Sequence, residues 1–293
     1  MSVQEKLLIK CAGLEICFVF PTEQIIPKEF IPFQDKGIKE RNNPDTTYEI
    51  ELLSEPLRLP EQPIMSYGDM RIYNHSDGWL RVYSALTADD GCQVATLVRR
   101  NNQSNILYYP ASKWDFYSEE LHFLHLLGIE EFLLNNSALL LHSSLVQLDG
   151  QTVLFSGPSG VGKSTQASLW EKYLRADVLN GDRCVIRKID ETFYGCGSPW
   201  AGTSGIYRKE MAPIKGIFIL KQSKETKVRQ IKAEAFVKIY QQCIVNAWDE
   251  QFVERITDLI MDLLRNVPVY EMACRPDKEA VDLAYNTLYK GGI

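Results

Sequence analysis

Short runs in which apolar and polar residues alternate fill the first hundred or so positions of the chain. KLLIKC and LEICFVF flank Ala12-Gly13, and DMRIYN and WLRVYSAL flank the turn His75-Ser76-Asp77-Gly78, so each pair predicts a β-hairpin. In the second hairpin, Gly78 is expected to take a positive φ. CQVATLVRR and SNILYYP predict a third pair of strands. Frequent β-branched and aromatic residues with short turns favour an antiparallel sheet.

The pattern changes near residue 117, where apolar residues begin to recur at helical spacing. Farther on, two strand-like runs flank Asp149-Gly150, a strong hairpin signal, and the second run leads into a glycine-rich loop and a helix. Residues 232–266 predict two helices separated near Asp249, and residues 277–290 predict a closing helix. We therefore predict a β-rich domain at residues 1–115 and an α/β domain at residues 116–293.

The hairpin before the glycine-rich loop determines the kind of sheet expected in the second domain. Parallel neighbours need a crossover of about a dozen or more residues, whereas this pair is joined by a tight turn. The pattern thus predicts a mixed sheet flanked by helices, in a chain that is α/β, or α+β overall once the β-rich domain is included. That first domain shows no residues with evident chemistry, and we expect it to serve substrate recognition or dimer contact.

Composition and charge limit the kinds of partner that we expect for this chain. The chain has 293 residues, of which 45% are hydrophobic and 24% charged, as in a globular protein, and its net charge of −6 argues against a nucleic-acid partner. No apolar run is long enough to span a bilayer and the first residues lack a signal-peptide pattern, so we expect a cytoplasmic protein without a membrane partner. The seven scattered cysteines are expected to be free thiols, mostly buried.

The segment GPSGVGKS, residues 157–164, fits the phosphate-loop (P-loop) pattern G-x-x-x-x-G-K-[ST] in full. Glycines let backbone N–H groups surround phosphate oxygens, and the helix that follows adds its positive end. Lys163 is expected to contact the β- and γ-phosphates of ATP, and the Ser164 hydroxyl to ligate Mg²⁺. The expected nucleotide contacts are Gly157, Pro158, Ser159, Gly160, Val161, Gly162, Lys163, Ser164 and Thr165.

Two residues near the loop in the predicted fold are candidates for catalysis. His142 begins the first arm of the hairpin, whose turn returns that end of the strand to the loop. Asp182 ends the predicted apolar strand VLNGD, which is expected beside the strand that enters the loop. An acid there suits a ligand of Mg²⁺ or a base that accepts the proton of a hydroxyl. The structural alternatives are a core histidine and a turn residue after Asn180-Gly181.

The segment GSPWAGTSG, residues 197–205, has small residues and hydroxyls that suit close approach to a phosphate or substrate, and equally suit an ordinary loop. A tryptophan in it is available for stacking, and nearby cations for charge neutralisation. Trp170, on the helix after the P-loop, is expected in the core. The candidate substrate or phosphate contacts are Ser198, Trp200, Thr203, Ser204 and Arg208.

At these residues the sequence resembles the HPr kinase/phosphorylase superfamily, whose catalytic domain is related to that of PEP carboxykinases. The resemblance covers about residues 137–290 and is carried by LLLHSSLV, SLVQLDGQTVLFSG, GPSGVGKS and LNGD in that order. It implies a loop that binds ATP or pyrophosphate, an active-site histidine at His142 and a base toward an acceptor serine at Asp182. The chain is most similar to HPr-kinase-like proteins found with peptide-modification systems, some of which phosphorylate a serine of a ribosomally made peptide.

The chain departs from this family at two places. Gly181 stands where the family typically has a second acid, and YGCGSPWAGTSG replaces its E-[IV]-R-G-type strand. We therefore do not extend to this chain the phosphorylase activity or the hexamer of the bacterial enzymes, and its oligomeric state stays open. The sequence predicts an ATP- and Mg²⁺-dependent kinase acting on a serine of a peptide or protein. The alternatives are a kinase of a small hydroxylated metabolite such as free serine, and a nucleotide-binding regulatory module without catalysis.

Overall fold

The computed structural model describes residues 5–21, 28–34, 43–84, 87–101, 103–114, 126–200 and 202–291. The chain forms two compact units, residues 1–132 and 133–293, each described here by itself. The predicted domain boundary at residue 115 and the start of the predicted helix near 118 lie outside the described residues. Helix α3 (Glu130–Asn135) crosses the boundary between the two units.

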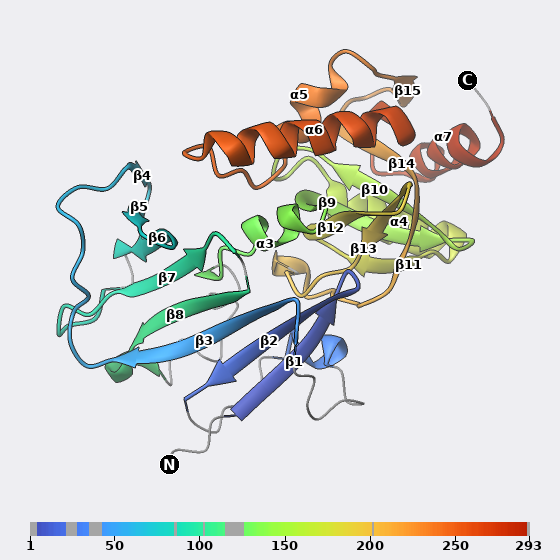
Figure 1. The fold of residues 1–293 in the computed structure, drawn as a ribbon. Coiled ribbons are helices and arrows are strands. Elements are labelled where there is room, and N and C mark those ends of the chain that lie inside the picture. The colour runs from blue at the N-terminus through green and yellow to red at the C-terminus, as the bar shows by residue number, and fades with distance from the viewer. Residues whose placement is uncertain are drawn as a thin grey trace. The chain divides into compact units, whose positions relative to one another are not determined.

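The first unit contains a sheet in the order β1-β2-β3-β8-β7-β6-β5-β4 (Figure 1). The predicted hairpins are present, because β1 pairs antiparallel with β2, β5 with β6, and β7 with β8. Its strands are β1 (Glu5–Cys11), β2 (Leu14–Phe20), β3 (Thr46–Leu53), β4 (Met65–Tyr67), β5 (Met70–His75), β6 (Gly78–Tyr83), β7 (Val94–Arg99) and β8 (Ser104–Pro110), with 3₁₀ turns at Ile31–Phe33 and Ala111–Lys113.

The expectation of a purely antiparallel sheet is wrong, because β3 runs parallel to both of its neighbours, β2 and β8. Short-range patterns found the hairpins correctly but could not show how they join. The chain between Phe20 and Thr46 is long enough for a crossover, which parallel pairing requires. Strand β8 reaches β3 only after the β4–β7 meander, a pairing set by tertiary contacts.

Gly78 has a different role from the one its turn predicts. It is the first residue of β6 and is absent from the glycines with positive φ. A Cβ at this position would collide with the carbonyl oxygen of Val98 in β7. Glycine is required here because the backbones of β6 and β7 approach closely. Close backbone approach is a common reason for glycine within a strand.

The second unit is built on a mixed sheet, as the hairpin before the P-loop predicts. Strand β10 pairs antiparallel with β9 and parallel with β14, and β14 pairs parallel with β16. The strands are β9 (Ala138–Leu148), β10 (Gln151–Ser156), β11 (Asp177–Asn180), β12 (Arg183–Ile189), β13 (Thr192–Cys196), β14 (Met211–Gln222), β15 (Lys227–Gln230) and β16 (Val269–Cys274). The helices are α4 (Lys163–Leu174), α5 (Ala235–Tyr240), α6 (Glu250–Asn266) and α7 (Lys278–Tyr289), with a 3₁₀ turn at Gly202–Ser204.

Strand β9 changes partners midway along its length. From Ala138 to His142 it pairs with β12, and residues 242–244 bond to its other edge. From Ser143 onward it pairs with β10 and, on the other side, with β11. The P-loop and the turn between β11 and β12 both leave the sheet at this change of partners, so the two meet there.

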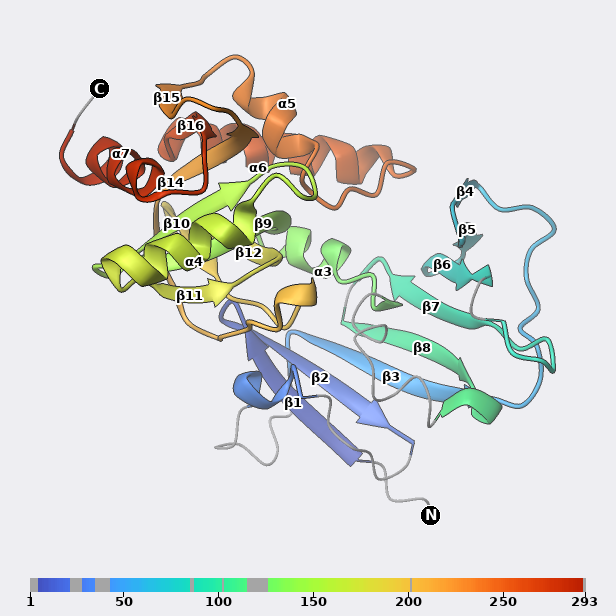
Figure 2. The ribbon, with the colours of Figure 1, turned by 180° about the vertical axis from the view of Figure 1, so that it is seen from behind.

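Helices cover both faces of the sheet. Figure 1 shows α5 and α6 in front, and Figure 2, seen from behind, shows α4 and α7 on the opposite face. Alternate residues of β10 face the two cores: Leu154 packs with the α5 and α6 side, and Phe155 with the α4 and α7 side. Trp170 is fully buried in the second of these cores, as predicted.

Two further expectations can be compared with the structure. All seven cysteines are free, and five are buried, which confirms the expectation of mostly buried thiols. Within the described ranges, no helix has both the length and the apolar character needed to cross a membrane.

We expect Gly78→Ala to destabilise the first unit by about 1–3 kcal/mol, because the new methyl group collides with backbone that cannot easily move. Amide hydrogen exchange in β6 and β7 measures the loss. Ser76→Ala, at an exposed turn position of the same hairpin, is the control. It should change the free energy of opening measured by exchange by less than about 0.5 kcal/mol. Equal exchange in the two variants would contradict the close-approach explanation.

Candidate functional site

The P-loop joins the end of β10 at Ser156 to the start of α4 at Lys163. Gly157, Gly160 and Gly162 have φ of 143°, 76° and 113°, the region that favours glycine. Gly162 is the N-cap of α4 and provides no side-chain cap, so the first-turn N–H groups of the helix can serve a ligand. A Cβ on Gly160 or Gly162 would meet nothing within 4 Å, so this part of the loop is open. The backbone therefore fits a phosphate chain.

Lys163 lies at the centre of the loop. Its Nζ donates hydrogen bonds to the carbonyl oxygens of Gly157 and Pro158, at 3.0 and 3.2 Å. Burial lowers the pKa of Lys163, and the nearby Asp182 carboxylate opposes this effect. The side chain thus holds a cation against the inside of the loop, where phosphate oxygens would be bound.

The remaining loop residues are more accessible. Pro158, Ser159, Ser164 and Thr165 are exposed. Ser164 is in the first turn of α4, and its hydroxyl, with the Asp182 carboxylate, supplies oxygen ligands of the kind that Mg²⁺ prefers. Mg²⁺ usually completes its coordination with phosphate oxygens and water, so two protein oxygens fit such an ion.

His142 and Asp182 form a hydrogen-bonded pair beside the loop. The His142 Nε2 atom lies 3.1 Å from Asp182 Oδ1, and both side chains are partly exposed, by 31% and 28%. The Ser156 hydroxyl, at the end of β10, donates to the His142 carbonyl oxygen at 2.8 Å, so the hairpin does bring His142 to the P-loop. The pair is accessible to a substrate and adjacent to the phosphate site.

The charge state of Asp182 follows from its neighbours. The hydrogen bond from His142 is the main cause of its lowered pKa, and the charges of His142, Arg183 and Lys163 act in the same direction, against desolvation. Arg183 Nε lies 3.7 Å from Asp182 Oδ2. Asp182 is therefore an ionised carboxylate at neutral pH, able to bind a cation or accept a proton.

The strand before Asp182 is not placed as predicted. Strand β11 pairs with β9 and not with the loop strand β10, so β9 lies between them. The strand also ends at Asn180, and Asp182 occupies the turn into β12. The antiparallel hairpin of β9 and β10 explains the difference, because it leaves only the other edge of β9 free for β11.

Buried polar residues that the sequence analysis missed support this turn. The Ser144 hydroxyl donates to the Gly181 carbonyl oxygen at 2.9 Å, and the Ser143 N–H donates to the Asp182 carbonyl oxygen at 2.9 Å. Ser143, Ser144, Ser156 and Asn180 are all fully buried. Their signal in the sequence was a polar residue within an otherwise apolar strand, which is costly unless it is hydrogen-bonded.

Residues 197–205 surround the Asp182 turn. Ser198 and Trp200 are buried, and the Ser198 hydroxyl donates to the Arg183 carbonyl oxygen. A Cβ on Gly202 would lie 2.5 Å from Asp182 Oδ2, so this backbone packs directly against the carboxylate. The side chain of Thr203 lies outside the described residues.

The structure also gives a reason for glycine at position 181. A Cβ on Gly181 would collide with the side chain of Ser204, so this arrangement has no room for a second carboxylate. Arg208, in contrast, lies at the surface, where it pairs with Asp177 at 2.9 Å. The structure thus brings His142, Lys163, Asp182 and Ser204 to one region and places Arg208 in a surface pair.

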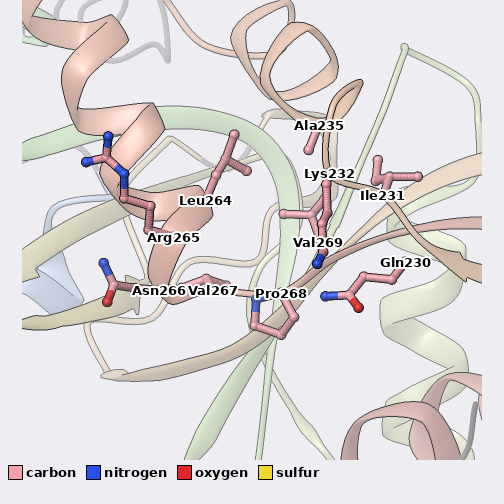
Figure 3. Close-up of a pocket in the computed structure, with 10 residues that line it drawn as sticks. All are labelled: Gln230, Ile231, Lys232, Ala235, Leu264, Arg265, Asn266, Val267, Pro268 and Val269. Carbon is pink, nitrogen blue, oxygen red and sulfur yellow. The ribbon is translucent and has the colours of Figure 1, made fainter.

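Cavities in the described part of the second unit include one beside the site and one far from it. A cavity of about 190 Å³ lies beside the site and is lined by His142, Arg183 and residues 241–244, among others. A larger cavity of about 470 Å³ lies between the end of α6 and the start of β16 (Figure 3). Because β16 and β10 run in the same direction as β14, that cavity is at the end of the sheet opposite the P-loop.

Comparisons with known proteins add little to this description. A scan against protein families and a search of curated proteins find no match. Among solved structures, the HPr(Ser) kinase/phosphatase from Coxiella burnetii is distantly similar, at 13% sequence identity and a TM-score of 0.32, over 52% of this chain and 88% of that chain. At this level the similarity carries no argument about function, which must rest on the residues of this chain.

We expect His142→Ala to raise the pKa of Asp182 toward its ordinary range, because the strongest stabiliser of the carboxylate is removed. Carbon-13 NMR titration of the Asp182 carboxyl group measures the change. Arg183→Gln should raise it less, because Arg183 acts only through its charge at 3.7 Å. The stabilisation from ionised Asp182 is full above its unfolded-state pKa and disappears as pH falls through the lowered folded-state pKa. An unchanged Asp182 pKa in the His142 variant would contradict the pairing.

Proposed function

We propose that this chain is an ATP- and Mg²⁺-dependent kinase that transfers the γ-phosphoryl group to a hydroxyl, with a serine of a peptide or protein as the acceptor. The observation that carries the proposal is the His142–Asp182 pair beside the P-loop lysine. A P-loop alone supports any nucleotide-binding activity. An accessible, ionised carboxylate next to it adds a group suited to accept a hydroxyl proton.

The residues of the site bind the phosphates, hold the metal ion and accept the proton in the proposed reaction. The P-loop N–H groups and Lys163 bind the phosphates, and Ser164 and Asp182 hold Mg²⁺, which would neutralise phosphate charge when bound. Asp182 accepts the acceptor's proton as the hydroxyl oxygen bonds to the γ-phosphorus and the bond to the ADP oxygen breaks. His142 holds the Asp182 carboxylate in position, and Arg183 adds positive charge nearby. We assign acceptor recognition or dimer contact to the β-rich first unit.

A nucleotide-binding module without phosphoryl transfer is the second candidate. The observation that favours it is Gly181, because Ser204 fills the space in which the related family has a second acid. A kinase of a small metabolite such as free serine uses the same site and differs only in its acceptor. Measuring nucleotide binding and phosphoryl transfer independently separates the regulatory module from the main proposal, and comparing peptide with free-serine acceptors separates the metabolite kinase.

The first experiment measures transfer of the γ-phosphoryl group from labelled ATP with Mg²⁺ to a panel of serine-containing peptides and to free serine. We expect Asp182→Ala to reduce transfer by about 100-fold or more, the usual loss when a general base is removed. Asp177→Ala, which removes an exposed carboxylate paired with Arg208, is the matched control and should retain activity. Undiminished transfer by the Asp182 variant would exclude it as the base.

The second experiment measures ATP affinity by calorimetry. We expect Lys163→Ala to weaken binding by roughly 10–100-fold, because charge-assisted hydrogen bonds to phosphate are lost. Lys209→Ala, at an exposed position, should bind ATP normally. If ATP binding depends on Lys163 but no acceptor in the panel is phosphorylated, the regulatory module becomes the better interpretation. Binding that is unaffected by Lys163→Ala would contradict both.

A further inference from the structure

Asn180 is a fully buried carboxamide at the end of β11, two residues before Asp182. Its Oδ1 accepts hydrogen bonds from the backbone N–H groups of Asp182 and Arg183, at 2.9 and 2.8 Å. These two bonds define the turn between β11 and β12. Together with the bonds from Ser143 and Ser144 to the same turn, they set the direction in which the Asp182 side chain leaves the backbone.

The other end of the same carboxamide holds a different segment. Its Nδ2 donates to the carbonyl oxygens of Ser198 and Trp200, at 3.0 and 3.3 Å, and also contacts the Ser198 hydroxyl at 3.2 Å. Asn180 thus uses both its acceptor and its donor groups inside the protein. Burying either group without a hydrogen-bond partner is costly, so this set of contacts is strongly constrained.

Ser198 closes the network from the opposite side. Its hydroxyl donates to the carbonyl oxygen of Arg183 and accepts from the N–H of Trp200 at 3.2 Å. A few residues later, the backbone of Gly202 packs against the Asp182 carboxylate. The turn that carries Asp182 and the segment that borders its carboxylate are therefore joined by a closed set of buried hydrogen bonds.

No other common side chain reproduces this arrangement. Aspartate has the acceptor oxygens but lacks the N–H donors and would bury a second negative charge near Asp182. Leucine has a similar size but no polar atoms. His142 approaches Asp182 from a different strand, β9, so the 3.1 Å separation of the pair depends on how accurately the turn is held.

We propose that Asn180 is the positioning residue of the site, which joins the Asp182 turn to residues 198–200 so that the carboxylate meets His142 and the P-loop. The positional part of this inference stands on the hydrogen bonds alone. Its kinetic consequence rests on the proposed kinase function. The two parts are tested by different measurements.

The positional test compares Asn180→Leu and Ser198→Ala with the unmodified protein. We expect Asn180→Leu to speed amide exchange in both 180–183 and 198–202, because the hydrogen bonds that join the two segments are lost. Ser198→Ala, the milder variant, should speed exchange in the same two segments by less. The double variant should lose less protection than the sum of the two single losses, because the two side chains belong to one network. Asn266→Leu, an exposed carboxamide on α6, is the control and should change neither.

The kinetic test uses the same variants in the phosphoryl-transfer assay. We expect kcat to fall by about 100-fold in Asn180→Leu, as for small displacements of a catalytic group, with ATP affinity unchanged.

The outcomes separate the two hypotheses. A folded Asn180→Leu or Ser198→Ala variant with unchanged exchange in 180–183 and 198–202 overturns the positioning role. Faster exchange in both segments with unchanged kcat overturns its kinetic consequence. If the unmodified protein phosphorylates no acceptor, the kinase proposal fails, and amide exchange still decides the role of Asn180.

Discussion

The change of partners along β9 is the constraint on which the second unit depends. A strand must have its backbone N–H and C=O groups satisfied along both edges wherever it is buried. Strand β9 meets this condition with β12 and residues 242–244 in its first half and with β10 and β11 in its second. Between the halves, the P-loop and the β11–β12 turn must both leave the sheet. The candidate site is at this point because the P-loop and the Asp182 turn meet there.

The same change of partners explains the buried polar residues around it. Ser143, Ser144 and Ser156 lie in apolar strands, and their hydroxyl or amide groups bond to backbone groups at the transition. Asn180 does the same for the turn and for residues 198–200. Such a network stabilises only while every member is paired, so it specifies one arrangement of the site. The apolar cores on both faces of the sheet provide most of the buried apolar surface that stabilises this arrangement.

The electrostatics of the site follow from this geometry. Asp182 is held between His142 and Arg183 near Lys163, and it is therefore ionised while remaining partly exposed. Gly181 and Gly202 allow Ser204 and the backbone to pack against the turn, which leaves space for one carboxylate and not for two. A kinase with this site would depend on a single acid supported by a histidine, which makes the orientation of that acid its most sensitive property.

The sequence by itself determined the local features: the hairpins, the P-loop between a strand and a helix, the mixed sheet of the second unit, and Trp170 in the core. Each depends on residues close together in the chain, where turn chemistry and apolar spacing act directly. Only the tertiary structure decided that β3 pairs parallel with β2 and β8, that β9 separates β11 from β10, that Gly78 serves a close backbone approach, and that Asn180 holds the Asp182 turn. These features join segments that are distant in sequence. Once the local elements have formed, some strand edges and buried polar groups still lack hydrogen-bond partners, and these groups determine which segments pair.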